Sequence, residues 1–363
     1  MPPPRPAPTR SRILVSAVAG LGLLGALLWG IWRQPAPAAP ETVLLAGETM
    51  GTTFQVTVVV PIASADVLES LRAGVEAELA SVDGTLSHYR ETSDIGRINS
   101  GEGTGWTAVA AETVEVLELA RGISERSGGA FDVTVAPLVG LWGFHHKQPL
   151  DAEPDPEQIA ALGKDIGYSL LEMDAARPAV RKARAGVQID LSAIAKGYGV
   201  DRVTGAIEGQ GHDRYLVEVG GEVRVRGRNA AGVPWRIGIE RPVDEGRDVF
   251  RALSLIDAAM ATSGDYRSFY ELAGRRVSHT IDPRTARPVE HGLASVTVVH
   301  DRCAEADGWA TALMVLGPDE GPEIAEREGL AALFLTRNDD GSFDERETSR
   351  FAERIFEPKE TAP

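Results

Sequence analysis

Apolar positions along the chain recur with two periods, the strand period of two and the helix period of about 3.6. Residues 54–58 alternate as a half-buried strand, and residues 65–82 carry apolar side chains at helical spacing. Residues 114–127 repeat the helical pattern and run into Gly128-Gly129, a pair typical of a helix end. The pattern therefore predicts a strand followed by two amphipathic helices.

Strand signals dominate the second half of the chain. Residues 215–219 and 222–225 are alternating runs joined through Gly220-Gly221, which predicts a β-hairpin. The pattern predicts one more helix, at residues 304–316, and further strands at residues 235–240, 252–256, 258–262, 277–283, 293–300 and 330–335. Mixed helices and hairpins favour an α+β fold with a largely antiparallel sheet over a βαβ series. No G-x-G-x-x-G follows a first strand, so a Rossmann cofactor site is not predicted.

The amino terminus has the character of a membrane anchor. Residues 1–12 contain three arginines and no acid, and residues 13–32 contain no charge. Twenty residues in a helix span ~30 Å, the thickness of the bilayer's hydrocarbon core. Because positive charge before a span keeps that end inside, the rest of the chain would face the periplasm from the inner membrane. Ala36-Pro37-Ala38 also fits a cleavage site, so a cleaved signal peptide and a soluble periplasmic protein stay open.

Composition limits what the rest of the chain can be. We expect residues 33–42 to form a proline-rich linker, residues 43–345 a folded domain, and residues 346–363 a carboxy-terminal tail. A formal net charge of −16 disfavours nucleic acid as a partner. The single cysteine, Cys303, excludes an intrachain disulfide and a cysteine cluster for zinc or iron–sulfur.

Residues 186–201, GVQIDLSAIAKGYGVD, hold the first candidate site. Alternation up to Asp190 and small residues after it predict a strand that turns into a helix, with Asp190 as the helix N-cap. Small residues let another molecule approach the backbone closely, and Lys196 adds positive charge. The stretch suits a phosphate-bearing ligand. An ordinary strand–turn–helix with a capping aspartate and a solvated lysine explains it equally well.

Four further residues carry candidate chemistry. Asp307 and Thr311 lie four apart in the predicted helix 304–316, hence on one face, and their oxygens suit Mg²⁺. The alternative is an aspartate favoured by the helix dipole and a threonine bonded back along the helix. His279 precedes an Asp-Pro turn, where a neutral imidazole could accept a proton or simply be an edge histidine. Asp132 interrupts an apolar run, which is costly unless its carboxylate is paired or functional.

The order of the short motifs is more specific than any one of them. The motifs are Met50-Gly51-Thr52, Ser87-His88-Tyr89 with Asp94 and Asn99, Gly129-Ala130-Phe131-Asp132 with Trp142-Gly143-Phe144, the nine residues from Asp190 to Tyr198, Val219-Gly220-Gly221, Thr262-Ser263-Gly264-Asp265-Tyr266, His279-Thr280-Ile281-Asp282-Pro283 and Ala306-Asp307-Gly308-Trp309-Ala310-Thr311-Ala312. In this order the chain resembles the ApbE family of FAD:protein FMN transferases, over about residues 44–335.

The resemblance implies an activity and a set of site residues. Members of the family use Mg²⁺ to transfer FMN from FAD to a serine or threonine of an acceptor protein, which forms a phosphoester and releases AMP. The acceptor would belong to a membrane respiratory or electron-transport complex. By matching motif, the FAD site would contain Met50, Tyr89, Ala130, Phe131, Asp132, Asp190, Lys196 and Ile281. The carbonyl of Ala193, with Asp307 and Thr311, would hold the metal, and His279 would be the catalytic base.

Two other functions stay open at this point. The same site with water as the nucleophile would be an Mg²⁺-dependent FAD pyrophosphatase that gives FMN and AMP. A protein that binds FAD without turnover is the second alternative. The chain also departs from the family pattern: Gly308-Trp309 stands where smaller apolar residues are expected, and no cysteine follows the apolar span to carry a lipoprotein anchor.

Overall fold

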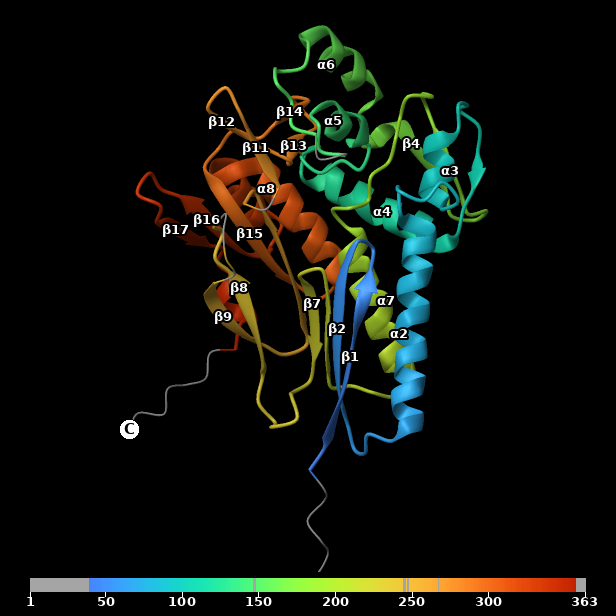
Figure 1. Cartoon of the computed structure of the whole chain (residues 1–363), viewed down its shortest axis with the longest axis vertical. Helices are drawn as coiled ribbons and strands as arrows, with labels where there is room; N and C mark the ends of the chain where they lie inside the picture. Colours follow the sequence, from blue (N-terminus) through green and yellow to red (C-terminus); the bar gives the residue numbers. More distant parts are fainter. Residues whose placement is uncertain (1–38, 146–147, 244–245, 247, 267, 357–363) are drawn as a thin grey trace, which may run out of the picture. The chain divides into compact units, whose positions relative to one another are not determined.

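An antiparallel sheet of eight strands is the frame of the folded part of the chain (Figure 1). Every neighbouring pair in it is antiparallel. In spatial order the strands are β1 (Glu41–Thr49), β2 (Thr52–Val60), β6 (Tyr215–Val219), β7 (Glu222–Arg226), β10 (Ala258–Gly264), β15 (Leu293–His300), β16 (Ala331–Arg337) and β17 (Phe343–Glu347). The α+β architecture with a large antiparallel sheet is thus confirmed.

The computed structural model describes residues 39–145, 148–243, 246, 248–266 and 268–356. The chain divides into two units, Met1–Pro40 and Glu41–Pro363. The predicted basic segment, residues 1–12, and membrane span, residues 13–32, lie outside the described residues. Within the described part, no helix combines the length and the apolar character that crossing a bilayer requires.

Helices and small sheets surround the large sheet. The helices are α2 (Ala65–Leu86), α3 (Asp94–Ser100), α4 (Ala111–Arg126), α5 (Ala136–Leu141), α6 (Pro156–Leu162), α7 (Ala195–Gly209), α8 (Cys303–Arg327) and α9 (Phe351–Arg354). The small sheets are β3 (Thr107–Ala108) with β5 (Ala179–Lys182) and β4 (Leu171–Asp174), β8 (Trp235–Glu240) with β9 (Val249–Leu255), β11 (Phe269–Leu272) with β12 (Arg275–Ser278), and β13 (Ile281–Asp282) with β14 (Arg287–Pro288).

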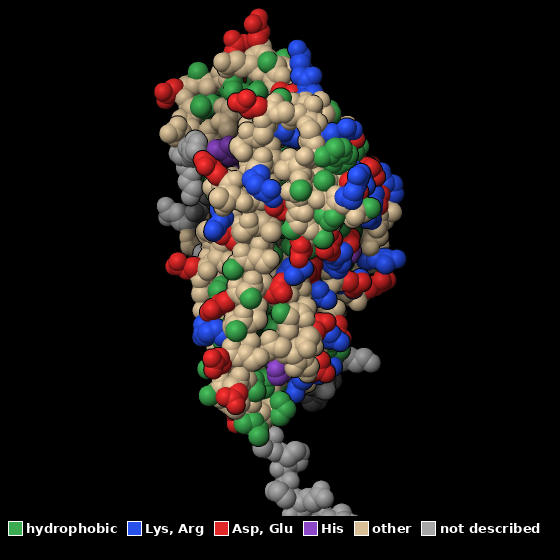
Figure 2. Space-filling view, turned by 90° about the vertical axis from the view of Figure 1, so that its right-hand side faces the viewer, with side chains coloured by type: hydrophobic (Ala, Val, Ile, Leu, Met, Phe, Trp, Pro, Cys, Tyr) green, Lys and Arg blue, Asp and Glu red, His purple; other side chains and the backbone are tan. Residues whose placement is uncertain are grey.

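Both faces of the large sheet are buried at its central strands. Along β2, Val58 packs in the core cluster that holds residues of α2 and α7, while Val59 packs in the cluster of β8 and β9. Successive strand residues point to opposite faces, so neighbouring valines serve different layers. The second cluster includes Phe351, which is fully buried although it lies in the segment expected to be a tail. Charged side chains of both signs mix over the surface seen in Figure 2.

Local sequence signals predicted several elements well. The hairpin of β6 and β7 is confirmed, and its two-residue turn has φ of 61° at Gly220 and 106° at Gly221. Helix α4 ends at Arg126, just before Gly128 and Gly129 with φ of 65° and 81°. Helix α8 continues to Arg327, but Gly317 is non-helical, so the predicted end at residue 316 coincides with the kink.

Two expectations about elements were wrong. Residues 277–283 do not form one strand, because β12 ends at Ser278 and the short β13 pairs in another sheet. Asp190 is not the N-cap of α7, which begins at Ala195 after Ile194. The Asp190 carboxylate instead accepts the N–H of Ser192 at 2.8 Å, so a local turn takes the place of the cap. Residues 187–189 are extended, with one isolated bridge from Gln188 to Val135.

Candidate active site

A cavity of about 620 Å³ opens where the β6–β7 turn, β10 and the amino-terminal end of α7 meet α8. Its volume falls within the range of small-molecule sites. All but two of the residues proposed from sequence line it: Ala130, Phe131, Asp132, Asp190, Ala193, Lys196, His279, Ile281, Asp307 and Thr311. The fold thus brings together segments that are more than a hundred residues apart in the chain.

Helices α7 and α8 are in close contact in this wall. The N–H of Gly197 donates a hydrogen bond of 3.0 Å to Oδ2 of Asp307. A Cβ at Gly197 would lie 2.4 Å from the carbonyl oxygen of Cys303 and 2.8 Å from the Cβ of Asp307. Only glycine therefore lets the two helices approach this closely.

A backbone oxygen just before α7 also has no donor. Gly197 lies in the first turn of α7, where N–H groups have no partner inside the helix, and Asp307 accepts its N–H instead. Ala193 precedes Ile194, the N-cap of α7, and its carbonyl accepts no hydrogen bond from the described residues. A carbonyl oxygen at a cavity wall without a donor is a ready ligand for a cation.

Asp307 and Thr311 supply the other two oxygens, from one face of α8. Asp307 is buried, and burial raises the pKa of its carboxyl while the positive charge of Lys196 opposes the rise. The Thr311 hydroxyl lies 3.0 Å from the hydroxyl of Ser263 on β10, which fixes its rotamer. A carboxylate, a hydroxyl and a carbonyl are hard oxygen donors, so this set fits a magnesium-like ion.

Lys196 and Glu222 form a buried ion pair beside these donors. Lys196 Nζ lies 2.5 Å from Oε1 of Glu222, whose side chain is 4% exposed. Burial raises the pKa of Glu222, and the charge of Lys196 opposes that rise. Burial alone would lower the pKa of Lys196, but the charges of Asp307 and Glu222 outweigh it and raise that pKa, so the ammonium stays charged.

His279 stands across the cavity with a defined orientation. Its Nδ1 lies 2.9 Å from the carbonyl oxygen of Ser268, a contact that requires a proton on Nδ1. The neutral ring therefore carries its lone pair on Nε2. Burial lowers the pKa of His279 below its usual value, and the Ser268 contact only partly offsets this. At neutral pH the ring is thus an uncharged base.

Asp132 is paired by the chain itself. One carboxylate oxygen accepts the N–H and the hydroxyl of Thr134 at 2.8 and 2.7 Å, and the other accepts the N–H of Tyr168 at 2.6 Å. Burial raises the pKa of Asp132, and these hydrogen bonds lower it. The aspartate in the apolar run therefore fixes the segment that carries Ala130 and Phe131 into the cavity.

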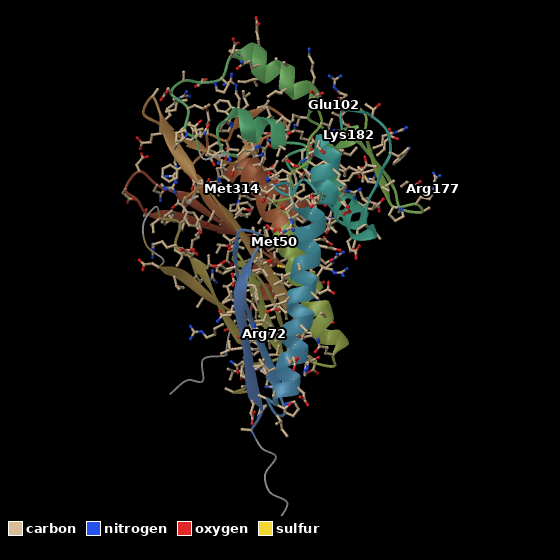
Figure 3. The ribbon with its side chains drawn as sticks, turned by 45° about the vertical axis from the view of Figure 1, so that its right-hand side comes forward. Met50, Arg72, Glu102, Arg177, Lys182 and Met314 are labelled. Atoms are coloured by element: carbon tan, nitrogen blue, oxygen red, sulfur yellow. The ribbon has the colours of Figure 1, made fainter. Side chains whose placement is uncertain are left out.

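Two of the residues proposed from sequence do not line this cavity. Met50 has a φ of 46° and forms, with Gly51, the two-residue turn between β1 and β2; Figure 3 shows it at the tip of that hairpin. It brings its neighbours Thr52 and Thr53 to the cavity. Tyr89 is 75% exposed and lines a separate cavity of about 350 Å³.

Comparison with known proteins identifies the family of the chain. The family model described as the ApbE family matches residues 50–334. The chain belongs to the ApbE family. It is 40% identical over 311 residues to the FAD:protein FMN transferase of Vibrio cholerae, covering 86% of this chain and 92% of that one. It is 37% identical over 327 residues to the protein of that name in Escherichia coli K12, covering 88% and 93%.

Solved structures of ApbE proteins share the fold. The flavin transferase ApbE from Vibrio cholerae superimposes with a TM-score of 0.77 and 38% identity, over 87% of this chain and 99% of that one. The apo flavinyl transferase ApbE from Pseudomonas stutzeri gives a TM-score of 0.78 at 38% identity, over 87% and 97%. The mixed helices around a large antiparallel sheet are therefore the ApbE architecture.

The unusual Gly308-Trp309 pair in this ApbE chain belongs to the core. Trp309 is fully buried and packs in the cluster around α4 and α8, with the Arg126 guanidinium 5.0 Å from its ring centre. A Cβ at Gly308 would lie 2.5 Å from Cδ1 of Ile123, so glycine lets α8 pack closely against α4.

Sequence reasoning missed several lining residues of this ApbE site. Glu222 directly follows the Gly220-Gly221 turn, and Ser263 lies between Thr262 and Gly264. Their partners, Lys196 and Thr311, lie far away in the chain. Alternation in residues 222–225 puts Glu222 with Arg224 on the polar face of the strand, so no local signal marked Glu222 as a buried residue. For Ser263 no local signal existed.

Proposed function

We propose that this chain transfers FMN from FAD to a serine or threonine hydroxyl of an acceptor protein and releases AMP. The observation that carries the proposal is the single cavity in which the Ala193 carbonyl, Asp307 and Thr311 lie with Lys196 and His279. The relatives named FAD:protein FMN transferase support the choice of substrate and reaction. FAD would occupy the cavity along Ala130, Phe131, Asp132, Asp190 and Ile281.

The donor set fits Mg²⁺, held by Asp307, Thr311 and the Ala193 carbonyl. When bound, the ion would neutralise charge that develops on the diphosphate. Asp307 benefits as well, because a buried carboxylate is stabilised by a nearby cation. The pair of Ser263 and Thr311 keeps the hydroxyl ligand in place.

The chain's own residues account for the proton and for part of the charge. Nε2 of His279 accepts the proton of the acceptor hydroxyl, because Nδ1 is committed to Ser268. The hydroxyl oxygen forms a bond to the flavin-side phosphorus, and the bond from that phosphorus to the bridging oxygen breaks. The bridging oxygen leaves with AMP. Lys196, charged and 30% exposed at its side chain, adds positive charge for the phosphates.

We also propose that residues 13–32 hold the chain at the inner membrane, with the catalytic unit in the periplasm. An acceptor in a membrane respiratory or electron-transport complex would then be within reach. The supporting observation is the charge-free stretch that follows three arginines. Membrane fractionation after alkaline washing tests the anchor: recovery of the mature chain in the soluble fraction with a truncated amino terminus would indicate signal cleavage instead.

The decisive experiment is intact-mass analysis of an acceptor incubated with this protein, FAD and Mg²⁺. A covalent gain equal to one FMN phosphoester, lost after substitution of the acceptor hydroxyl, is the expected result. A parallel incubation without acceptor measures free FMN and AMP. Rapid release of both with no acceptor labelling would indicate a pyrophosphatase, and tight FAD binding with neither product would indicate a binding protein.

A further inference from the structure

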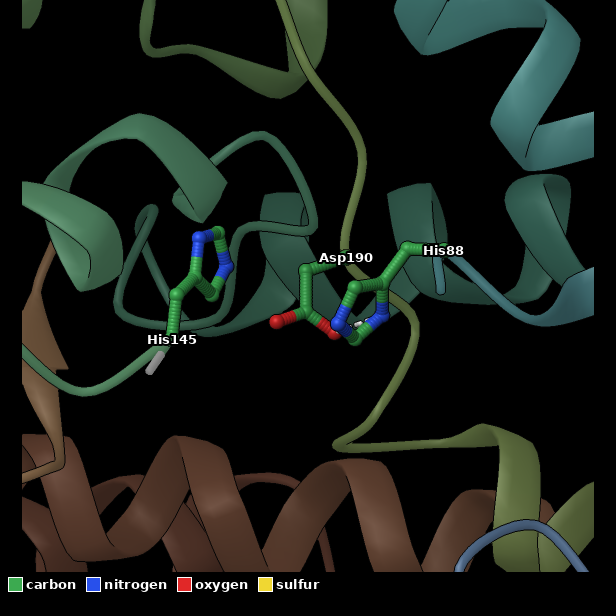
Figure 4. Close-up of side chains that lie close together, drawn as sticks. All are labelled: His88, His145 and Asp190. Atoms are coloured by element: carbon green, nitrogen blue, oxygen red, sulfur yellow. Dashed lines mark ion pairs between the residues drawn. The ribbon is translucent and has the colours of Figure 1, made fainter. Parts of the chain in front are cut away.

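Two histidines and an aspartate meet at the edge of the site, outside the proposed magnesium ligands. His88, His145 and Asp190 each present one ligand atom, and these atoms lie within 4.8 Å of one another. The three residues come from the turn after α2, the segment after α5 and the turn before α7. Figure 4 shows the side chains converging, with the Asp190 carboxylate between the two rings.

The orientation of His88 leaves one ring nitrogen available. Nδ1 lies 3.2 Å from Oδ1 of Asp190, so the proton of the neutral ring belongs on Nδ1 and the lone pair on Nε2. Nε2 is buried and has no hydrogen-bond partner within the described part of the chain. A buried nitrogen lone pair without a donor is unfavourable unless something else, such as a metal, occupies it.

The second ring is held close to the first. The ring centres of His88 and His145 are 5.7 Å apart, and the planes are nearly parallel at 26°. Gly140 makes room for this arrangement, because a Cβ there would lie 3.1 Å from Nδ1 of His145. Both rings line a cavity of about 350 Å³ next to Tyr89, which offers space for a water ligand.

We infer that His88, His145 and Asp190 form a binding site for a divalent transition metal of the Zn²⁺ class. Two imidazoles and one carboxylate, with a fourth position for water, are a recurrent zinc donor set. Ligand atoms at ~2.1 Å from one ion lie at most about 4.2 Å apart, so small side-chain rotations close the present spacing. Imidazole nitrogen suits zinc-like metals, whereas Mg²⁺ prefers oxygen, so the two sites would select different ions.

The proposed zinc site lies next to the larger cavity, in which we propose that FAD binds, but it does not require FAD. Asp190 lines the larger cavity, while His88 and His145 line the smaller one. The inference therefore concerns metal binding by the free protein and goes beyond the proposed transfer reaction. It needs no activity to be measured.

The test uses the full-length chain without an affinity tag, stripped with a chelator. Zn²⁺ is titrated in competition with a chromophoric chelator, in the presence of millimolar Mg²⁺. We expect one Zn²⁺ per chain, and at least tenfold weaker binding in each of His88→Ala and His145→Ala. His212→Ala, at a histidine outside the cluster, should bind as the wild type does. Circular dichroism of each variant controls for folding.

A second readout separates these ligands from other surface groups. Co²⁺ bound to the wild-type protein should give the intense visible bands of a four-coordinate site, and His88→Gln should lose them while keeping its circular dichroism spectrum. Wild-type binding no tighter than that of the folded His88→Ala/His145→Ala double variant would overturn the inference. So would Co²⁺ spectra that are identical in wild type and His88→Gln.

Discussion

The backbone N–H of Gly197 donates a 3.0 Å hydrogen bond to the buried carboxylate of Asp307, 110 residues further along the chain. This one contact joins the start of α7 to α8 and satisfies an N–H of the first helical turn, which has no partner inside the helix. It therefore fixes the carboxylate in the wall of the cavity that Ala193 also lines. The proposed metal site depends on a glycine that is not itself a ligand.

Gly197→Ala should damage both stability and transfer. The new Cβ would meet the Cys303 carbonyl oxygen at 2.4 Å, and this backbone group has little room to adjust. Overpacking of this kind typically costs about 1–3 kcal/mol. Urea unfolding should show that loss, and transfer should need more Mg²⁺.

Gly205→Ala is the matched control on the same helix. A Cβ there meets no atom within 4 Å, so the helix should gain about 0.5–1 kcal/mol from the better helix former. Equal stability of the two variants would contradict the steric argument for Gly197.

Asp307→Asn separates the charge of this residue from its position. The amide oxygen can still accept the N–H of Gly197, so the fold should hold, and loss of a buried carboxylate with a raised pKa removes a desolvation cost. Transfer should fall by at least about 100-fold, because the proposed metal loses its anionic ligand. Asp319→Asn, at an exposed position of α8, should be unchanged in both respects. Full transfer by Asp307→Asn would refute the metal assignment.

The sequence predicted those parts of the site that depend on one helix. Asp307 and Thr311 share a face of α8 because residues four apart always do in a helix, and the structure puts both at the cavity. The β6–β7 turn followed equally well from Gly220-Gly221, where both φ values are positive. Such relations are set by local geometry alone.

Asp190 shows where local reasoning fails. Its position before a small-residue stretch suggested a helix cap, but its carboxylate is divided between Ser192 in a tight turn and His88 from a distant loop. The contact with His88 helps to decide where the Asp190 carboxylate lies, and no residue near position 190 in the sequence predicts that contact. The pairing of Glu222 with Lys196 depends in the same way on how β7 packs against α7.

His279→Gln tests the proposed base through its pH dependence. Burial lowers the pKa of His279, so transfer should decline only at a pH below the usual pKa of histidine, as the ring gains its proton. The glutamine amide can still donate to the Ser268 carbonyl, which keeps the local structure.

The variant should lose about 100- to 10,000-fold in kcat, the usual contribution of a general base, and should no longer show the acidic decline. FAD affinity, measured by flavin fluorescence, should change little. His300→Gln, at a histidine paired with Glu305, is the control. An unaltered pH profile in His279→Gln would remove this residue from the proton transfer.

Substitutions of Lys196 and Glu222 should affect the free energy of unfolding jointly, whereas transfer should depend on Lys196 itself. Lys196→Met leaves a carboxylate that is 4% exposed without its partner, and breaking a buried pair costs about 3–5 kcal/mol. The double variant Lys196→Met/Glu222→Gln replaces both charges with neutral groups of similar size, so urea unfolding should recover most of that loss. Transfer should not recover, because the double variant still lacks the ammonium that Lys196 contributes beside the phosphates. Equal unfolding free energies for the single and double variants would show that the ion pair does not determine the stability of this wall. Restored transfer in the double variant would show that the ammonium of Lys196 is not needed by the substrate.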